Sequence, residues 1–421
     1  MLKLSKYNIN YIREKLILYS LIFIIAFTTP NNILAASFQL AQDKKIQVHG
    51  FASQAFIYTD NNNFFGNSAD KGSFEFTELG VNFSFEAWHK FHIAAQLLSR
   101  RAGESDNGTI KVDFALADYR FIDSNLMSLG VRAGRIKNPF GIYNDTRDVP
   151  FTRSSIILPQ SIYFDRTRDI SISSDGIQLY GHRTFSVGIA NIQLLAALPR
   201  VDETNTEIAV VGQIRPGNLN SKLSFVNRIG FENHNNTFRV RLSDALLNIE
   251  YNPTTTELGF SPGESTFQFH LTILSLQYNF KHWEFTGEIA RREINVDNIV
   301  YIPPFLEETI GLSYYFQTAY HLNFRWKFLL RYDVLYQNKN DKDGSDYATQ
   351  LAALGAIKPG HSRYSKDLTL GIQYDLNRSW MVRAEIHSVD GTAWLPVLDN
   401  EDIDNPIQKW RMATASVSYR F

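Results

Sequence analysis

The 421-residue chain contains no cysteine, which excludes a disulfide scaffold, a zinc finger and any thiol chemistry. It has no excess charge of one sign, because 42 Lys and Arg stand against 43 Asp and Glu, a formal net charge of −1. A nucleic-acid binder needs a basic excess to displace counterions, so we expect no nucleic-acid partner. Aromatic residues are abundant instead, at 14% with 31 Phe and 20 Tyr.

Residues 1–36 are typical of a signal peptide. Basic residues near the amino end precede an apolar run at 16–27, and small residues follow at 35–37. The apolar run is shorter than the roughly 20 residues of a membrane-spanning helix and matches a signal-peptide core. An amino-terminal membrane anchor or a buried helix is the alternative. We therefore expect an exported protein whose mature chain is 37–421.

The mature chain alternates apolar and polar residues with a period of two, which is the pattern of β-strands. The clearest stretch, 322–337, is long for a soluble sheet, in which strands average about 5–6 residues. A tilted strand that crosses a bilayer needs about 9–11 residues plus extensions. Within 267–280 the apolar positions change phase, and either a bulge or a buried apolar run would produce this.

Sixteen segments of this kind follow one another, and the connections between them alternate between short and long. Short turns at one end and long loops at the other are typical of a membrane barrel. In lipid every backbone N–H and C=O must be paired internally, which a closed sheet achieves. We therefore predict an all-β fold, a transmembrane antiparallel β-barrel of about 16 strands around an aqueous channel. The predicted strands are 46–59, 73–86, 90–101, 110–121, 127–136, 175–182, 185–197, 220–231, 238–250, 265–279, 283–294, 307–317, 322–337, 364–376, 379–390 and 409–421.

The third long connection, at about 137–174, carries enough aromatic and aliphatic residues to fold against other parts of the molecule. Loops of this length are usually functional or disordered. We predict that it bends into the barrel and constricts the pore. The alternative is an exposed loop packed on its neighbours or on a partner subunit. The charged residues expected at the constriction are Arg135, Lys137, Arg147, Asp148, Arg153, Arg166 and Arg168.

The alternation also predicts which charged residues of the strands face the lumen. Basic residues lead slightly where Arg325, Lys327 and Arg331 lie on one predicted strand, so we expect a mild anion preference. The alternative is a solvated wall whose charges are screened within about 10 Å. The predicted lumen-wall residues are Arg239, Arg241, Arg325, Lys327, Arg331, Asp333 and Arg383, opposed by Asp113, Glu284, Glu288 and Glu385.

The stretch 135–141, Arg-Ile-Lys-Asn-Pro-Phe-Gly, resembles the segment that enters the corresponding loop in the phosphate-selective porin O/P family and its relatives. The strand opening at 48–53 and the last strand, which ends on Phe421, also resemble that group. The resemblance implies a trimeric diffusion porin surrounded by the lipid of a Gram-negative outer membrane. It also implies that the barrel-assembly machinery reads the terminal aromatic residue.

One departure from that family concerns the charges of the loop. Basic and acidic residues over 137–174 nearly balance, whereas phosphate-selective members carry a lysine-rich constriction, so phosphate specificity does not transfer. A mixed-charge constriction suits small hydrophilic or zwitterionic solutes, or modest ion selectivity.

Two other functions compete with a porin. A barrel hydrolase would need a Ser/His or Asp/His group, and His387 beside Glu385 and Arg383 is the nearest arrangement in the sequence. An adhesin or structural barrel would carry longer loops and a lumen filled by apolar residues. Residues 341–346 resemble a calcium loop but lack its first and last ligands, and no nucleotide-binding or nucleophile motif occurs. We therefore expect no catalytic residue, no metal and no cofactor.

Overall fold

The structure is a computed structural model, and it describes residues 36–41, 44–201, 204–212, 217–253, 265–299, 302–400 and 405–421. Residues 1–35 of the predicted signal peptide lie outside the described residues, so that segment stays a prediction.

The described chain is dominated by long strands, with few short helices in the connections. The strands are β1 (Ala36–Ala41), β2 (Lys44–Thr59), β3 (Ser73–Trp88), β4 (Phe91–Ala102), β5 (Asp106–Asp123), β6 (Met127–Lys137), β7 (Ser173–Phe185), β8 (Gly188–Pro199), β9 (Gly217–Asn233), β10 (Phe238–Pro253), β11 (Ser265–Phe280), β12 (Trp283–Asp297), β13 (Glu308–His321), β14 (Trp326–Tyr336), β15 (Tyr364–Asp375), β16 (Trp380–Gly391) and β17 (Lys409–Arg420). The α-helices are α2 (Arg168–Ile172), α3 (Thr204–Val211) and α5 (Ser345–Ala353). The 3₁₀ turns are η1 (Asn144–Thr146), η2 (Pro150–Thr152), η3 (Asp165–Thr167), η4 (Pro304–Leu306) and η5 (Gly360–Arg363).

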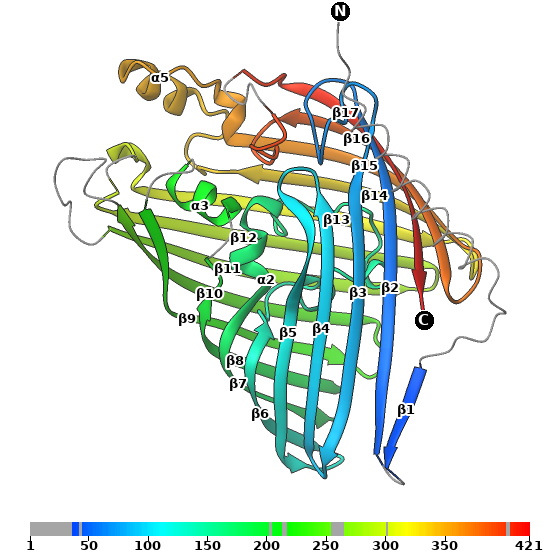
Figure 1. The fold of residues 1–421 in the computed structure, drawn as a ribbon. Coiled ribbons are helices and arrows are strands. Elements are labelled where there is room, and N and C mark those ends of the chain that lie inside the picture. Colours follow the sequence, from blue (N-terminus) through cyan, green and yellow to red (C-terminus); the bar gives the residue numbers. More distant parts are fainter. Residues whose placement is uncertain are drawn as a thin grey trace, which may run out of the picture.

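Strands β2 to β17 form a closed antiparallel barrel of 16 strands (Figure 1). Each strand pairs with its neighbours in the chain, and β17 closes the ring by pairing with β2. The additional strand β1 pairs with the first residues of β2. It lies on the same edge of β2 that pairs with β17 further along β2. The predicted fold class is therefore confirmed. None of the helices among the described residues is long and apolar enough to cross a membrane.

All sixteen predicted segments are strands, and their ends differ from the prediction by a few residues. One of the largest differences, of four residues, is at 322–337, where β14 begins only at Trp326. The side-chain oxygen of Asn323 accepts hydrogen bonds from the amides of Arg325 and Trp326, at 2.8 and 3.0 Å. This local capping of the backbone makes residues 322–325 a turn and not the start of a strand.

The two faces of the strands differ as the alternation predicted. On β14 the outward side chains of Phe328, Leu330 and Tyr332 are each more than 40% exposed, whereas the inward Arg331 and Asp333 are buried. At the short-turn end, Trp side chains contact Tyr side chains of neighbouring strands. These pairs are Trp283–Tyr320, Trp326–Tyr374 and Trp380–Tyr419, with ring centroids 4.6, 4.5 and 4.7 Å apart. They correspond to an aromatic girdle at a membrane interface.

The phase change in 267–280 comes from a buried apolar run and not from a bulge. Strand β11 keeps an unbroken register with both β10 and β12. Phe267, Phe269 and Ile273 point inward and are buried, while Leu274 and Leu276 point outward and are exposed. The inward residues need apolar partners inside the barrel, and the connection between β6 and β7 supplies them.

Candidate functional site

The connection between β6 and β7, residues 138–172, contacts the inner face of the barrel on several sides; we call it the inner loop. Tyr163 donates a hydrogen bond from its hydroxyl to Glu288 of β12 at 2.6 Å. The amide of Ser161 donates to Asp333 of β14 at 3.3 Å. The amide of Ile156 donates to Glu385 of β16. The loop is therefore held by carboxylates from strands that are far apart in the sequence.

One side of the inner loop is apolar, and we call it the apolar side. It packs on buried residues of β8 to β13 and on Val210 and Val211 of α3. In Figure 1, α2 of the loop and α3 lie close together within the outline of the barrel, and their residues are in contact. The loop residues in this cluster are Phe140, Tyr143, Leu158, Ile162, Tyr163 and Ile170.

Tyr163 is the centre of the apolar side. Its side chain is fully buried, and its ring lies 6.3 Å from that of Phe140 and 5.6 Å from that of Tyr143. Its hydroxyl accepts hydrogen bonds from the amides of Ile142 and Tyr143, at 2.8 and 2.9 Å, while donating to Glu288. Each of these polar groups is thereby satisfied inside an apolar environment, as buried polar groups require.

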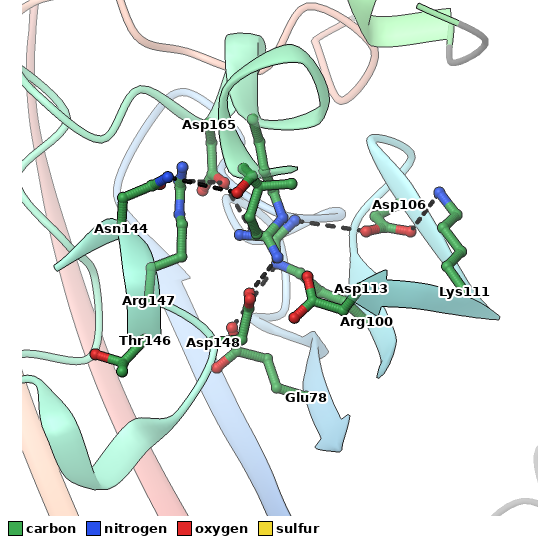
Figure 2. A network of polar contacts seen from close by, with 12 residues as sticks. Glu78, Arg100, Asp106, Lys111, Asp113, Asn144, Thr146, Arg147, Asp148 and Asp165 are labelled. Atoms are coloured by element: carbon green, nitrogen blue, oxygen red, sulfur yellow. Dashed lines mark hydrogen bonds and ion pairs between the residues drawn. The ribbon is translucent and has the colours of Figure 1, made fainter. Parts of the chain in front are cut away.

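The opposite side of the inner loop faces β3 to β6 through charged residues, and we call it the charged seam (Figure 2). Arg100 of β4 lies 3.8 Å from Glu78 and Asp106 and 3.0 Å from Asp165 of the loop. Lys137, at the end of β6, bridges Asp113 of β5 and Asp148 of the loop, at 2.5 and 2.7 Å. Three further ion pairs join Arg147 to Asp165, Arg153 to Glu78 and Arg168 to Asp148.

Asp148 shows how strongly the charged seam is coupled. Burial alone would raise the pKa of this carboxyl group, but the guanidinium of Arg168 and the ammonium of Lys137 outweigh burial and lower it. Both of its carboxylate oxygens carry a charged partner. Asp148 is therefore an anion in the folded protein and neutralises two loop-side cations.

Strands β14 and β16 bind residues 153–157 of the inner loop, which we call the loop tip. Arg331 donates to the hydroxyl of Ser155 at 3.1 Å and to the carbonyl of Ile157 at 2.9 Å. Arg383 donates to the carbonyls of Arg153 and Ser155, at 3.2 and 2.8 Å. Both arginines are buried, so they position the loop and are not open to solvent.

The structure separates the predicted constriction residues into two groups. Lys137, Arg147, Asp148, Arg153 and Arg168 meet in the charged seam. Arg135 lies elsewhere: it follows the outward phase of β6, opposite the outward Asp175 of β7, and makes two hydrogen bonds to that carboxylate at 2.8 and 2.9 Å. Its place on the outer face corrects the expectation that it lines the pore.

Arg166 also lies apart from the charged seam. Its guanidinium donates to the carbonyl of Leu395 at 3.0 Å and lies over the ring of Phe164. Burial, together with the smaller effect of the nearby Arg363, lowers its pKa to about 10. It connects the inner loop to the connection between β16 and β17.

The predicted lumen-wall residues also divide. Arg331, Asp333 and Arg383 contact the inner loop as described, whereas Arg325 lies in the exposed turn before β14 and stacks on Phe324. Arg239, Arg241 and Lys327 line a cavity between the inner loop and the short-turn ends of β10 to β14. The sequence analysis missed Glu78 and Arg100. The alternation of β3 and β4 indicates that both side chains face inward, but it does not indicate which loop residues pair with them.

His387 of β16 lies beneath the loop tip and is completely buried. Its Nδ1 is 2.9 Å from Asp367 and its Nε2 is 3.4 Å from Glu385, so carboxylates flank both ring nitrogens. The hydroxyl of Thr369 lies 3.1 Å from Nδ1. These residues form a buried polar cluster next to Arg331. Across the described ranges, no three His, Asp or Glu side chains are grouped so that they could hold a metal ion.

Known structures share this fold at low sequence identity. The outer membrane channel DcaP of Acinetobacter baumannii is 11% identical with a TM-score of 0.56, over 92% of this chain and 100% of that one. The anion-selective porin from Comamonas acidovorans is 11% identical with a TM-score of 0.57, over 90% and 100%. OmpF of Salmonella typhi, solved with daunomycin, is 13% identical with a TM-score of 0.53, over 92% and 100%. No protein-family profile and no curated sequence matches the chain. The resemblance to the phosphate-selective porin O/P family therefore stays a prediction.

Proposed function

We propose that this protein is a porin of a Gram-negative outer membrane, which gives passive diffusion to small hydrophilic or charged solutes. The observation that carries the proposal is the charged seam inside a barrel whose outer face is apolar. Charged residues are expensive to bury, and a structural plug would be built more simply from apolar residues. A solute path explains why ionisable groups are concentrated at this point.

The diffusion path runs along the polar surface of the inner loop, past the cavity lined by Arg239, Arg241 and Lys327, and not along the apolar side. The apolar side is filled by packed side chains and offers a polar solute no hydrogen-bond partners. The charged seam has buried polar atoms without a hydrogen-bond partner among the described protein atoms, including Nε of Arg100 and of Arg153. Because buried polar groups are normally satisfied, water is expected to reach these atoms. The inner loop is accordingly the constriction of the pore.

The finer properties follow from the same arrangement. A mild anion preference is expected because Arg241 and Lys327 have no carboxylate partner among the described residues, whereas Arg331 and Arg383 are occupied by the loop. A homotrimer, a leader cleaved near 36 and recognition of Phe421 by the barrel-assembly machinery complete the proposal, and they rest on the sequence resemblance. A neighbouring structure described as the trimer form of Vibrio cholerae OmpT has the same fold.

Planar-bilayer recording of the refolded protein tests the proposal. We expect stepwise openings that close in threes, with a reversal potential across a salt gradient that is displaced toward the chloride value. Cation preference would keep the porin and contradict the anion preference. A folded, heat-modifiable barrel without conductance would favour the second candidate, an adhesin or structural barrel. One specific observation supports that candidate: the apolar cluster fills one side of the lumen.

Paired cysteine variants locate the path, since the chain has no cysteine of its own. Ser154→Cys places a thiol where the inner loop borders the cavity lined by Arg241 and Lys327. Ala245→Cys places a thiol on β10, within the apolar cluster. A negatively charged thiol reagent should reduce the current of the first variant and leave the second unchanged. The reverse result would place the path on the apolar side.

A further inference from the structure

The cavity between the inner loop and the wall is large enough to hold a small solute. Its volume is about 350 Å³, within the range of about 300–1,000 Å³ that is usual for ligand sites. It lies near the short-turn end of the barrel, because Glu284 and Lys327 come directly after the turns that begin β12 and β14. Its roof is the inner loop, with Tyr143 and Asp145.

Three charged side chains of this cavity have no opposite charge within ion-pair distance among the described residues. Arg241 donates only to the carbonyls of Gly141 and Ile142, at 3.2 and 3.3 Å. The ammonium of Lys327 makes no hydrogen bond or ion pair with any described residue. Glu284 accepts only a long hydrogen bond, of 3.4 Å, from the hydroxyl of Ser154.

The other charges around the cavity are already neutralised. Asp145 pairs with Arg228 at 2.7 Å. Arg239 pairs with Glu232 at 3.1 Å and also donates to Gln277. Arg153 pairs with Glu78 across the charged seam. Arg241, Glu284 and Lys327 are therefore the charged groups of the cavity outside an ion pair, and together they carry a net charge of +1.

These three charges have an order along the wall. Arg241 is on β10, Glu284 on β12 and Lys327 on β14, so the carboxylate lies on the strand midway between the two cations. Strand spacing of about 4.8 Å separates β10 from β14 by about 19 Å along the curved wall. The two long basic side chains project inward from a quarter of the ring and shorten that gap across the cavity.

We infer that this cavity is a binding site for an acidic amino acid, an inference that rests on the proposed porin function. The two carboxylates of the ligand pair with Arg241 and Lys327, and its ammonium pairs with Glu284. The ligand's net charge of −1 neutralises the site. Charge-assisted hydrogen bonds of this kind are the strong ones, and a guanidinium binds a carboxylate through two parallel hydrogen bonds.

The pattern distinguishes three small molecules of similar length. Glutamate satisfies all three charges. Glutarate has both carboxylates but leaves Glu284 facing the methylene chain, and glutamine leaves one cation without a partner. A site that hydrogen-bonds a group discriminates strongly against the analogue that lacks it. We expect glutamate to bind at least about tenfold more tightly than either analogue.

Equilibrium dialysis of radiolabelled glutamate against the full refolded barrel in detergent measures binding without requiring conductance. Lys327→Gln should weaken glutamate and glutarate binding by at least about tenfold. Glu284→Gln should weaken glutamate binding and leave glutarate binding unchanged or stronger. Lys281→Gln, which removes an exposed cation of the adjacent turn outside the cavity, is the matched control and should change neither.

Arg241→Gln tests the third contact, but Arg241 also supports the loop backbone. Arg241→Lys, which keeps the charge, separates the two roles, and the Lys327 and Glu284 variants decide the proposal if both Arg241 variants misfold. Equal binding of glutamate and glutarate to the native protein, or a Glu284→Gln variant with unchanged preference, would overturn the inference.

The outcomes also separate the site from the channel. Normal conductance without binding of any of the three solutes would overturn the site and leave the porin proposal standing. Glutamate binding to a barrel that conducts no current would leave the site standing and overturn the porin proposal.

Discussion

The inner loop contacts the barrel through two very different surfaces. Its apolar side packs on β8 to β13 with aromatic and aliphatic residues around Tyr163. Its charged seam faces β3 to β6 with five basic and five acidic side chains, Arg100, Lys137, Arg147, Arg153 and Arg168 against Glu78, Asp106, Asp113, Asp148 and Asp165. The same 35-residue span, 138–172, is thus held by hydrophobic burial on one side and by ion pairs on the other.

The difference teaches which contacts are permanent and which are exchangeable. Apolar packing has no partner in water, so exposing the apolar side would cost the full free energy of burial. A buried charge that loses its partner altogether is costly, but it can exchange that partner for a charged solute that offers the same contact. The apolar side therefore anchors the loop, and the charged seam is the side whose contacts a charged solute or a substitution can exchange.

The largest effect is expected from removing the anchor. Tyr163→Ala deletes a fully buried ring and three hydrogen bonds, so the free energy of unfolding should fall by about 3–5 kcal/mol and the loop should be released. Single-channel conductance should rise with the release. Tyr163→Phe, the matched control, keeps the ring and should cost only about 1–3 kcal/mol. An unchanged conductance in Tyr163→Ala would show that the charged seam alone holds the loop.

A smaller effect is expected from the charged seam itself. Glu78→Gln removes the carboxylate of Arg153 and one of the three carboxylates of Arg100. The freed positive charge should move the reversal potential further toward the chloride value, and the loss of a buried ion pair should also lower the free energy of unfolding. The double variant Glu78→Gln with Arg153→Gln should return the potential to near its native value. A shift that persists in the double variant would contradict a local charge effect.

Arg135→Gln is expected to have almost no effect on conduction. The pair formed by Arg135 and Asp175 lies on the outer face with both side chains partly exposed, and such pairs contribute about 0–1 kcal/mol. Conductance and reversal potential should match the native values. A change comparable to that of Glu78→Gln would place Arg135 at the pore after all.

The smallest expected response is that of Asp148 to acid. Its pKa is lowered, so its ionised form stabilises the fold at any pH above the ordinary value of about 3.9, and that contribution is lost only as pH falls through the lower folded-state value. The carboxyl carbon of Asp148, assigned by comparison with Asp148→Asn, should show no NMR titration between about pH 7 and about pH 4. A midpoint within that range would mean that Arg168 and Lys137 do not hold the group.

Much of the fold was readable from the sequence because strand periodicity is a local property. Consecutive side chains of a strand point to opposite faces, so the pattern of each segment assigns its inward and outward residues without knowledge of its neighbours. Glu78, Arg100 and Arg331 all lie on the face that their segment predicts. The separation of long and short connections likewise follows from the chain alone.

Arg135 and Arg325 do not lie where the sequence analysis expected them. In both cases the cause is local and is not encoded by a period of two. Arg135 and Lys137 are two residues apart and were expected on one face, but Arg135 pairs with the outward Asp175, whereas the long side chain of Lys137, the last residue of β6, reaches the buried carboxylates of Asp113 and Asp148. Arg325 was expected within a strand, but it lies in a turn, and β14 begins only after it, at Trp326.

The sequence by itself determined the sixteen strands, the inward charges and the apolar residues of the long third loop, since each depends on residues close together in the chain. Only the tertiary structure decided the partners, because closure of the ring and the path of the loop bring together residues far apart in sequence. Glu78 meets Arg153, Arg100 meets Asp165 and Tyr163 meets Glu288 across separations of 75, 65 and 125 residues. A long-range contact depends on how all the intervening strands assemble, so no local pattern specifies it.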